Sequence, residues 1–331
     1  MIVVDADVLG RRRTGDETYV RELLRALPAV APDLRLAAVT RDPSLVPPGV
    51  EPLSLPGSSQ ELRMAWRLPR LLRRLRPELA HFLHVIPPGC PCPAVLTIQD
   101  LSFERDPSVM SAWERRVFRT TVPRSARRAA RILAISERTR DDLVDLYGIP
   151  AERILVTPLG VDTDFRPGGA RGDYLLLVGA IEPRKDPLAA AAAARAVGRP
   201  LVVVGPARDT RLETALRNAG ADLRGYVAKP ELVRLYQEAA CVLFPSRYEG
   251  FGLPLVEAMA CGTPVVARPD AALHEVAGDA AVFADGDLGD AVRIALADSE
   301  RLSAAGLERA KQFTWEETAR LTAAAYRELV A

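Results

Sequence analysis

The feature that most constrains this fold is an alternation of short apolar strand patterns with longer amphipathic helix patterns. The alternation comes in two series, separated by a turn-rich stretch at 158–173. The first series places strands at 2–6, 35–40, 79–83, 94–100 and 131–136. The second series places strands at 174–180, 200–205, 223–227, 241–246 and 264–267. Alternating strands and helices are typical of parallel sheets covered by helices.

The length of 331 residues is about twice that of a typical domain, which favours two domains. We therefore expect an α/β protein with two Rossmann-like parallel-sheet domains facing a central cleft. The N-terminal domain is predicted at 1–160 and the C-terminal domain at 161–312. The amphipathic helix at 313–331 either stays with the second domain or crosses back to the first.

Composition narrows the classes of function. Hydrophobic residues make up 48% and charged residues 26%, as in an ordinary globular protein, and the net charge of +1 argues against nucleic-acid binding. The start "MIVVDADVLG" has no basic region and no apolar run approaches the roughly 18 residues of a membrane span, so we expect a cytoplasmic protein without a signal peptide. The four cysteines lack metal-ligand spacing and are expected to be free thiols: Cys90, Cys92, Cys241 and Cys261.

The stretch "FPSRYEGFGLPLVEAMACGTPVVA" at 244–267 is the most informative strand-to-helix turn. The strand is predicted to end at Ser246, and Gly250 and Gly252 let the backbone approach a ligand closely. Pro254 suits the start of a helix, which Gly262 ends. Such turns lie at the carboxyl edge of a parallel sheet, where ligands bind.

Two carboxylates flank these glycines. The amides near Leu253 and Leu255 are expected to point outward and favour a phosphate. Glu257, placed in the first helical turn, suits a ribose diol, whereas Glu249 is placed further out, towards the group that the phosphate carries. The alternative is that both glutamates are solvated charges beside a structural turn.

A second turn, "YLLLVGAIEPRKDP", ends a strand at Gly179 and presents Arg184 and Lys185 before the next helix. Arginine binds a diphosphate as a bidentate fork and lysine as a point charge. Alone, such a pair is usually solvated surface. It gains weight because the same sheet edge is predicted to carry Glu249 and Glu257.

These motifs resemble a retaining, nucleotide-sugar-dependent glycosyltransferase of the GT-B type, in the glycosyl transferases group 1 family. "RYEGFGLPLVEAMACGTPVVA" is similar to the family's E-x7-E element and "VGAIEPRKD" to its diphosphate loop. "LRGYVAKPELVRLYQEAACVLFPS", "EVAGDAAVFAD" and "VTPLGVDTDFRP" match its usual spacing, so the resemblance covers most of the chain.

The resemblance implies roles for these residues. Arg184 and Lys185 neutralise the diphosphate, Glu257 binds the ribose, and Glu249 contacts hydroxyls of the transferred sugar. The backbone near Tyr226 and Val227 receives the base. The turns around the donor contribute Gly179, Ser246, Gly250, Phe251, Gly252, Leu253, Pro254 and Leu255.

The resemblance also implies that the N-terminal half carries the rest of the donor site. "TGDETYVRELLRAL" aligns with a glycine-rich loop and helix over the donor phosphates, which indicates Gly15. Where relatives often have a second glycine, this chain has Glu17. Where many relatives have His-Asp at a strand end, it has Gln99 and Asp100. Glutamine can donate a hydrogen bond, but unlike histidine it cannot take up or release a proton.

His81 and His84, in "AHFLHVIPP", are predicted at the end of another strand, facing the same cleft. A structural role and an acceptor-side role are both open for them. Asp5 and Asp7 fit the format of a D-x-D metal motif but lie on the first strand. We expect no metal and no other cofactor.

The sequence thus favours transfer of a hexose, first mannose from GDP-mannose, to a glycan, lipid-linked or small-molecule acceptor. Alternatives are a UDP-sugar donor, a non-catalytic nucleotide-sugar-binding partner subunit, a GT-B epimerase and a nicotinamide oxidoreductase. The absence of G-x-G-x-x-G after the first strand argues against the oxidoreductase. Residues 61–140 hold 16 arginines against seven acids. The arginine-rich stretches 61–76 and 113–131 are either solvated helix faces or a peripheral contact with anionic membrane.

Overall fold

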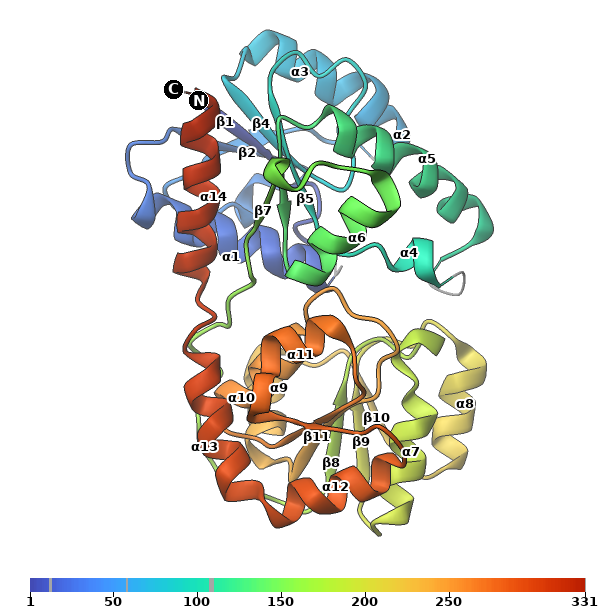
Figure 1. Cartoon of the computed structure of the whole chain (residues 1–331). Coiled ribbons are helices and arrows are strands. Elements are labelled where there is room, and N and C mark those ends of the chain that lie inside the picture. Colours follow the sequence, from blue (N-terminus) through green and yellow to red (C-terminus); the bar gives the residue numbers. More distant parts are fainter. Residues whose placement is uncertain (12–13, 58, 107–109, 331) are drawn as a thin grey trace. The chain divides into compact units, whose positions relative to one another are not determined.

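The computed structural model describes residues 1–11, 14–57, 59–106 and 110–330, and the chain divides into two compact units. The N-terminal unit comprises Met1–Leu101, Ala112–Gly160 and Trp315–Ala331, and the C-terminal unit comprises Ser102–Ser111 and Val161–Thr314. Each unit is a parallel sheet with helices on both faces (Figure 1), which confirms the predicted pair of Rossmann-like folds. No described helix has the length and apolarity that crossing a membrane would require.

The sheet of the N-terminal unit has the order β3-β2-β1-β4-β5-β6-β7, and all its pairings are parallel. Its strands are β1 (Ile2–Asp5), β2 (Leu36–Thr40), β3 (Glu51–Ser54), β4 (Leu79–Leu83), β5 (Ala94–Ile98), β6 (Arg131–Ala134) and β7 (Ile154–Val156). The edge strands β3 and β7 are additions to the five strands predicted from the sequence, because short edge strands lack the long apolar runs of central ones.

The N-terminal unit also holds the helices α1 (Thr14–Val30), α2 (Gln60–Leu62), α3 (Leu68–Leu75), α5 (Ala112–Arg128), α6 (Glu137–Tyr147) and α14 (Trp315–Val330). A π-helical turn, η2 (Arg63–Arg67), joins α2 to α3. Helix α6 is capped at both ends: the Ser136 side chain accepts a hydrogen bond from the Thr139 amide, and Gly148 ends the helix in the left-handed conformation.

The last helix, α14, packs along α1 (Figure 1). Trp315 at its start lies 6.5 Å from the Tyr19 ring, and Tyr326 near its end is fully buried. Arg327 forms an ion pair with Asp33 on the surface of the same unit. The sequence from Trp315 onward is therefore part of the N-terminal unit.

The sheet of the C-terminal unit has the order β10-β9-β8-β11-β12-β13, again all parallel. Its strands are β8 (Leu175–Val178), β9 (Leu201–Val204), β10 (Asp222–Gly225), β11 (Cys241–Phe244), β12 (Val265–Ala267) and β13 (Val282–Phe283). Its helices are α4 (Ser102–Arg105), α7 (Pro187–Ala196), α8 (Thr210–Asn218), α9 (Lys229–Glu238), α10 (Leu253–Ala260), α11 (Ala271–Ala277), α12 (Leu288–Ala297) and α13 (Ser299–Ala310).

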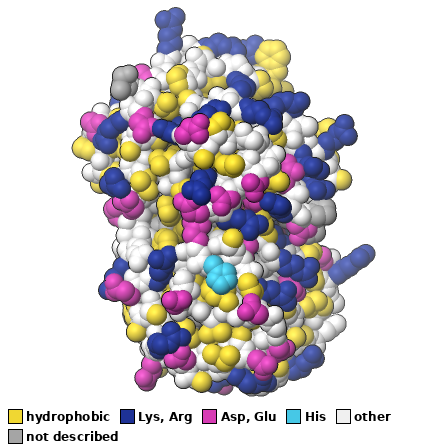
Figure 2. Space-filling model, in the orientation of Figure 1, with side chains coloured by type: hydrophobic (Ala, Val, Ile, Leu, Met, Phe, Trp, Pro, Cys, Tyr) yellow, Lys and Arg dark blue, Asp and Glu magenta, His cyan; other side chains and the backbone are white. Residues whose placement is uncertain are grey.

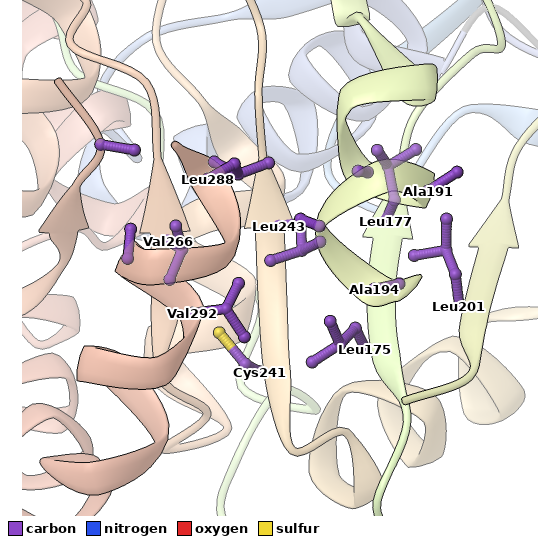
Figure 3. Close-up of a cluster of buried hydrophobic side chains, with 14 of the residues drawn as sticks. Leu175, Leu177, Ala191, Ala194, Leu201, Cys241, Leu243, Val266, Leu288 and Val292 are labelled. Carbon is purple, nitrogen blue, oxygen red and sulfur yellow. The ribbon is translucent and has the colours of Figure 1, made fainter. Parts of the chain in front are cut away.

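One face of this second sheet forms a buried hydrophobic core with α7 and α12 (Figure 3). Leu177 and Leu243 project from neighbouring strands towards Ala191 and Ala194 of α7 and Val292 of α12. Alanine at the helix positions lets α7 approach the strands closely, so the strands and the turns that follow them have a rigid base.

Candidate functional site

The candidate site of the C-terminal unit lies at the point where the strand order reverses. The chain runs outward from β8 through β9 to β10, then returns to the other side of β8 with β11, β12 and β13. The loops after β8 and β11 therefore leave neighbouring strands in opposite directions. In open parallel sheets, ligands bind in the crevice at this reversal.

The loop after β8 holds Arg184 in a fixed position. A short 3₁₀ turn, η5 (Pro183–Lys185), follows the strand, and Arg184 Nε and Nη2 donate to Glu182 Oε1 at 3.2 and 2.9 Å. Arg184 Nη1 donates to the Tyr248 carbonyl at 2.7 Å, and Arg208 binds the other oxygen of Glu182 at 3.1 Å. Glu182 is buried, so it orients the arginine from within the protein.

The loop after β11 places Glu249 directly against both cations. Lys185 Nζ lies 2.5 Å from Glu249 Oε1, and Arg184 Nη1 lies 3.4 Å from Oε2. Lys185 Nζ also lies 5.2 Å from the centre of the Phe244 ring. Glu249 is only 6% exposed and its carboxylate pairs with both cations. Its expected place further out than Glu257, towards the transferred group, stays a prediction.

These cations keep Glu249 ionised. Burial alone would raise its pKa, but Lys185 and Arg184, together with a hydrogen bond from Ser246, outweigh burial and hold the pKa below its usual value. Ser246 itself is buried two residues after β11, which ends at Phe244 and not at Ser246 as predicted. A buried carboxylate that stays charged beside two cations forms a preorganised polar cluster.

Helix α10 starts differently from the sequence-based expectation. Leu253 is its first residue, Pro254 its second, and Gly252 precedes it with a φ of +98°, a conformation that favours glycine. The Leu255 amide donates to the Gly252 carbonyl at 2.9 Å. The prediction of an outward-pointing amide at Leu255 is therefore wrong, because that amide closes the first turn.

Glu257 is the fifth residue of α10, so its predicted place in the first helical turn is also wrong. It is half-buried, and the Tyr236 hydroxyl donates to its Oε2 at 2.8 Å. Burial raises the pKa of Glu257 to about 7, against the lowering effects of the Tyr236 hydrogen bond and of Lys229. With this pKa, the protonation of Glu257 changes near neutral pH.

The residues expected at the base lie beyond β10. Gly225 ends that strand with a φ of +63°, Tyr226 is 66% exposed, and Val227 is half-buried. Lys229, at the start of α9, forms ion pairs with Asp162 and Asp164. An exposed aromatic ring next to a loop backbone is a suitable surface for stacking a base.

Within the N-terminal unit, Gly15 and Gln99 are neighbours. Gly15 lies in the first turn of α1, and a Cβ at this position would lie 3.5 Å from Gln99 Oε1. Gln99 Nε2 is buried and has no hydrogen-bond partner among the described residues. Asp100, the next residue, is half-buried. An amide donor of this kind can serve a ligand that approaches the strand end.

Glu17, which replaces a second glycine of the resembled loop, has a structural role. Its Oε1 accepts a hydrogen bond from the Gly10 amide at 3.1 Å, and it forms an ion pair with Arg21 one helical turn later. Glu17 is buried. Its carboxylate therefore joins the loop after β1 to the start of α1.

The two histidines differ in their surroundings. His81 is buried, its Nδ1 lies 2.5 Å from the Tyr326 hydroxyl and its Nε2 lies 2.7 Å from Thr97 Oγ1. Burial lowers the pKa of His81 to about 3, so the ring is neutral. The prediction that His81 faces a cleft is wrong, because both of its nitrogens are used inside the unit.

His84 follows β4 with a φ of +57°, which is uncommon for a residue other than glycine. Its Nε2 lies 3.4 Å from Asp16 Oδ1 on α1, and its ring lies 6.3 Å from Phe118. It is half-buried. An acceptor-side role therefore stays a prediction for His84 alone.

The structure thus brings Arg184, Lys185 and Glu249 into direct contact. Sequence reasoning missed two residues that hold this site, Glu182 and Tyr236. A tyrosine on the buried face of a predicted helix needs a partner for its hydroxyl, which is the only signal the sequence offers for Tyr236.

Two family models match the chain. The model described as Glycosyltransferase Family 4 matches residues 13–165, and the model described as Glycosyl transferases group 1 matches residues 172–298. The second match contains the turns after β8 and β11 and the whole of α10.

Curated relatives carry related names. The chain is 32% identical over 266 residues to the O-antigen chain mannosyltransferase B of Escherichia coli, which covers 71% of this chain and 70% of that protein. It is 34% identical over 239 residues to the D-inositol 3-phosphate glycosyltransferase of Kribbella flavida, covering 60% of this chain and 56% of that protein. The chain thus spans little more than half the length of the second relative.

Solved structures share the fold. The sucrose-phosphate synthase of Thermosynechococcus elongatus superposes with a TM-score of 0.79 at 19% identity, over 99% of this chain and 98% of that one. This likeness, together with the two parallel sheets, confirms the predicted GT-B fold class. The chain belongs to the glycosyl transferases group 1 family: it is a nucleotide-sugar-dependent hexosyltransferase with the GT-B fold.

Proposed function

We propose that this chain transfers a hexose with retention of configuration, and that its donor is GDP-mannose. The observation that carries the proposal is the cluster of Lys185, Arg184 and Glu249 at the strand-order reversal. The E. coli relative, whose name is that of a mannosyltransferase, favours mannose over other hexoses. The acceptor is a glycan, a lipid-linked glycan or a small molecule.

The cluster suits a leaving nucleoside diphosphate. As the bond between sugar and phosphate breaks, negative charge grows on the diphosphate and positive charge on the sugar ring. Lys185 and Arg184 stabilise the first, and the ionised Glu249 lies beside them to contact hydroxyls of the sugar. Removing one preorganised group of this kind typically costs about 10²- to 10³-fold in rate. We propose that these side chains do this without a metal ion.

In this proposal the acceptor attacks the same face of the sugar that the diphosphate leaves. The acceptor oxygen forms the new bond to the anomeric carbon, the bond from that carbon to the phosphate oxygen breaks, and the leaving phosphate takes the acceptor proton. Glu257 holds the ribose, and the loop at Tyr226 and Val227 receives the base. The predicted donor-binding roles of Gly15 and Gln99 are part of the same proposal.

Calorimetric titration with GDP, UDP and ADP tests this donor site. Wild type and Glu257→Ala are compared without added metal. We expect selective binding of GDP and at least a tenfold loss of affinity in the variant. Selective binding of UDP instead would keep the chemistry and change the donor to a UDP-sugar.

A non-catalytic nucleotide-sugar-binding subunit is the second candidate function, favoured by Glu17 and Gln99, which depart from the pattern of the family. Slow hydrolysis of the donor separates the two. An enzyme releases free sugar at a rate that Glu249→Ala abolishes, whereas a binding subunit binds the donor and leaves it intact.

The acceptor side includes a peripheral contact with anionic membrane in our proposal. Trp113 at the start of α5 is 72% exposed and Trp66 on η2 is 57% exposed, each among arginines. Figure 2 shows Lys and Arg side chains mixed with acidic ones on the displayed face. The proposed contact is made by the arginine-rich stretches 61–76 and 113–131. Sedimentation with anionic vesicles, absent with neutral vesicles and reduced by Arg116→Glu, is the expected result.

A further inference from the structure

The Tyr236 side chain connects the interior of the C-terminal unit to Glu257. Tyr236 lies on α9, is fully buried, and its hydroxyl donates to Glu257 Oε2 at 2.8 Å. Burial and the nearby Glu257 raise the pKa of Tyr236 well above its ordinary value, so it stays a hydrogen-bond donor at all physiological pH values. A buried phenol needs a partner, and here the partner is a carboxylate.

The surrounding structure fixes the position of this hydroxyl. The Phe165 ring meets the Tyr236 ring edge to face at 5.7 Å. The Tyr236 carbonyl accepts a hydrogen bond from Thr263 Oγ1 at 2.6 Å, and Thr263 is buried between α10 and β12. Tyr236 is therefore held at its ring and at its backbone, and its hydroxyl defines where Glu257 Oε2 lies.

The other carboxylate oxygen, Glu257 Oε1, forms no hydrogen bond within the described part of the chain. Three other charged or titratable groups influence the carboxylate. Lys229 comes from the start of α9, Asp162 from the segment before β8, and Cys261 from the end of α10. Lys229 is itself bound to Asp162, so its attraction for Glu257 is partly offset.

We propose that Tyr236 is a positioning residue that presents the Glu257 carboxylate to the diol of the donor's ribose. The proposal rests on the proposed function and adds to it the origin of ribose recognition. With Oε2 fixed by the phenol, Oε1 and the second lone pair of Oε2 accept the two ribose hydroxyls. A 2′-deoxyribose offers only one of them.

This arrangement makes the preference for ribose depend on pH. A protonated Glu257 would offer fewer acceptor lone pairs to the diol, so the ribose form binds best when Glu257 is ionised. With a Glu257 pKa of about 7, the ionised fraction rises roughly tenfold from pH 6 to pH 8. The phosphates titrate in the same way in the ribonucleotide and in the 2′-deoxyribonucleotide. Their effect on affinity therefore cancels in the ratio of the two affinities.

The experiment is calorimetric titration of the intact chain with GDP and 2′-deoxy-GDP at pH 6, 7 and 8, or with UDP and its 2′-deoxy form if UDP is the nucleotide that binds. Wild type, Tyr236→Phe and Glu257→Gln are compared. Tyr174→Phe is the matched control. It also removes a tyrosine hydroxyl that contacts α9, since the Tyr174 hydroxyl donates to the Leu235 carbonyl at 2.8 Å.

We expect the wild type to prefer the ribose form by at least tenfold at pH 8. Tyr236→Phe should lower this preference at least fivefold and leave the affinity for the 2′-deoxy form within twofold. It should also move the pH midpoint of the affinity ratio upward, because it removes a hydrogen bond that lowers the Glu257 pKa. Tyr174→Phe should keep both the ratio and the midpoint.

Two results would overturn the inference while the proposed function stands. One is a wild type that binds both nucleotides equally, and the other is a Tyr236→Phe variant with an unchanged ratio and midpoint. An equal loss of both nucleotides in Tyr236→Phe and Tyr174→Phe would show a purely structural role. If the wild type bound no nucleotide at all, the proposed function would be refuted, and the inference with it.

Discussion

Replacing Glu249 by glutamine separates its two expected effects, on diphosphate binding and on transfer. In the structure, the Glu249 carboxylate neutralises Lys185 at 2.5 Å and Arg184 at 3.4 Å. A diphosphate that binds these cations must replace part of this interaction. The variant should therefore bind a sugar-free nucleoside diphosphate more tightly than the wild type does, while its transfer rate falls.

The size of the gain follows from the contacts that are exchanged. A hydrogen bond to a charged group contributes about 1.5–3 kcal/mol, and a neutral one about 0.5–1.5 kcal/mol. Glutamine can still form the neutral hydrogen bond with Lys185, so a diphosphate that displaces it loses about 1 kcal/mol less than in the wild type. This difference corresponds to roughly a fivefold gain in affinity for the diphosphate. The rate of sugar transfer should fall by about 10²- to 10³-fold, because glutamine carries no charge towards the sugar.

The assay is calorimetric titration with GDP in phosphate-free buffer at low salt, and Lys185→Met is the opposite control. That control removes a cation and should lose at least tenfold in affinity. Thermal unfolding of both variants accompanies the titration, since each removes one member of the buried Lys185–Glu249 ion pair and is expected to destabilise the unit by roughly 3 kcal/mol. Weaker binding of GDP by a folded Glu249→Gln variant, with Lys185→Met unaffected, would refute the reasoning.

Two further predictions concern stability. Gly205→Ala should lower the free energy of unfolding by more than about 3 kcal/mol. The added Cβ would lie 2.0 Å from the Gly179 carbonyl oxygen, and the φ of Gly205 is +140°. Gly286→Ala is the control in the same denaturant titration, because a Cβ at Gly286 would meet open space. The buried, neutral His81 has a pKa of about 3 in the folded chain and about 6.5 when unfolded, so its stabilising effect is complete above pH 6.5 and is lost towards pH 3, by about 1.4 kcal/mol per pH unit. In His81→Phe this part of the pH dependence should disappear, and an unchanged profile would contradict the assignment.

The sequence was sufficient to predict the strand-turn-helix units and the sheet edge that their polar residues share. Arg184 and Lys185 follow one predicted strand, Glu249 follows another, and parallel strands end at the same edge of a sheet. That rule requires only the order of the elements, which the apolar pattern supplies. The direct pairing of Glu249 with Lys185 depends on loop conformations, which the pattern does not contain.

Errors arose where the outcome depends on one or two residues or on distant partners. The helix α10 starts at Leu253, one position before the expected start at Pro254, and this shift places Glu257 just beyond the first turn. His81 is buried because Tyr326, 245 residues later in the chain, supplies a hydroxyl to its ring. Such a partner becomes visible only once α14 is placed on the N-terminal unit.

The measurement that tests the central claim most directly is the release of nucleoside diphosphate from a panel of nucleotide-sugars. GDP-mannose, GDP-glucose, UDP-glucose and ADP-glucose are each incubated with wild type and with Glu249→Ala, without added metal. The account predicts turnover of one donor, GDP-mannose, by the wild type and a loss of at least about 100-fold in the variant. Equal turnover by both proteins would contradict the assignment of Glu249, and no turnover of any donor that the wild type binds would contradict the proposed transfer.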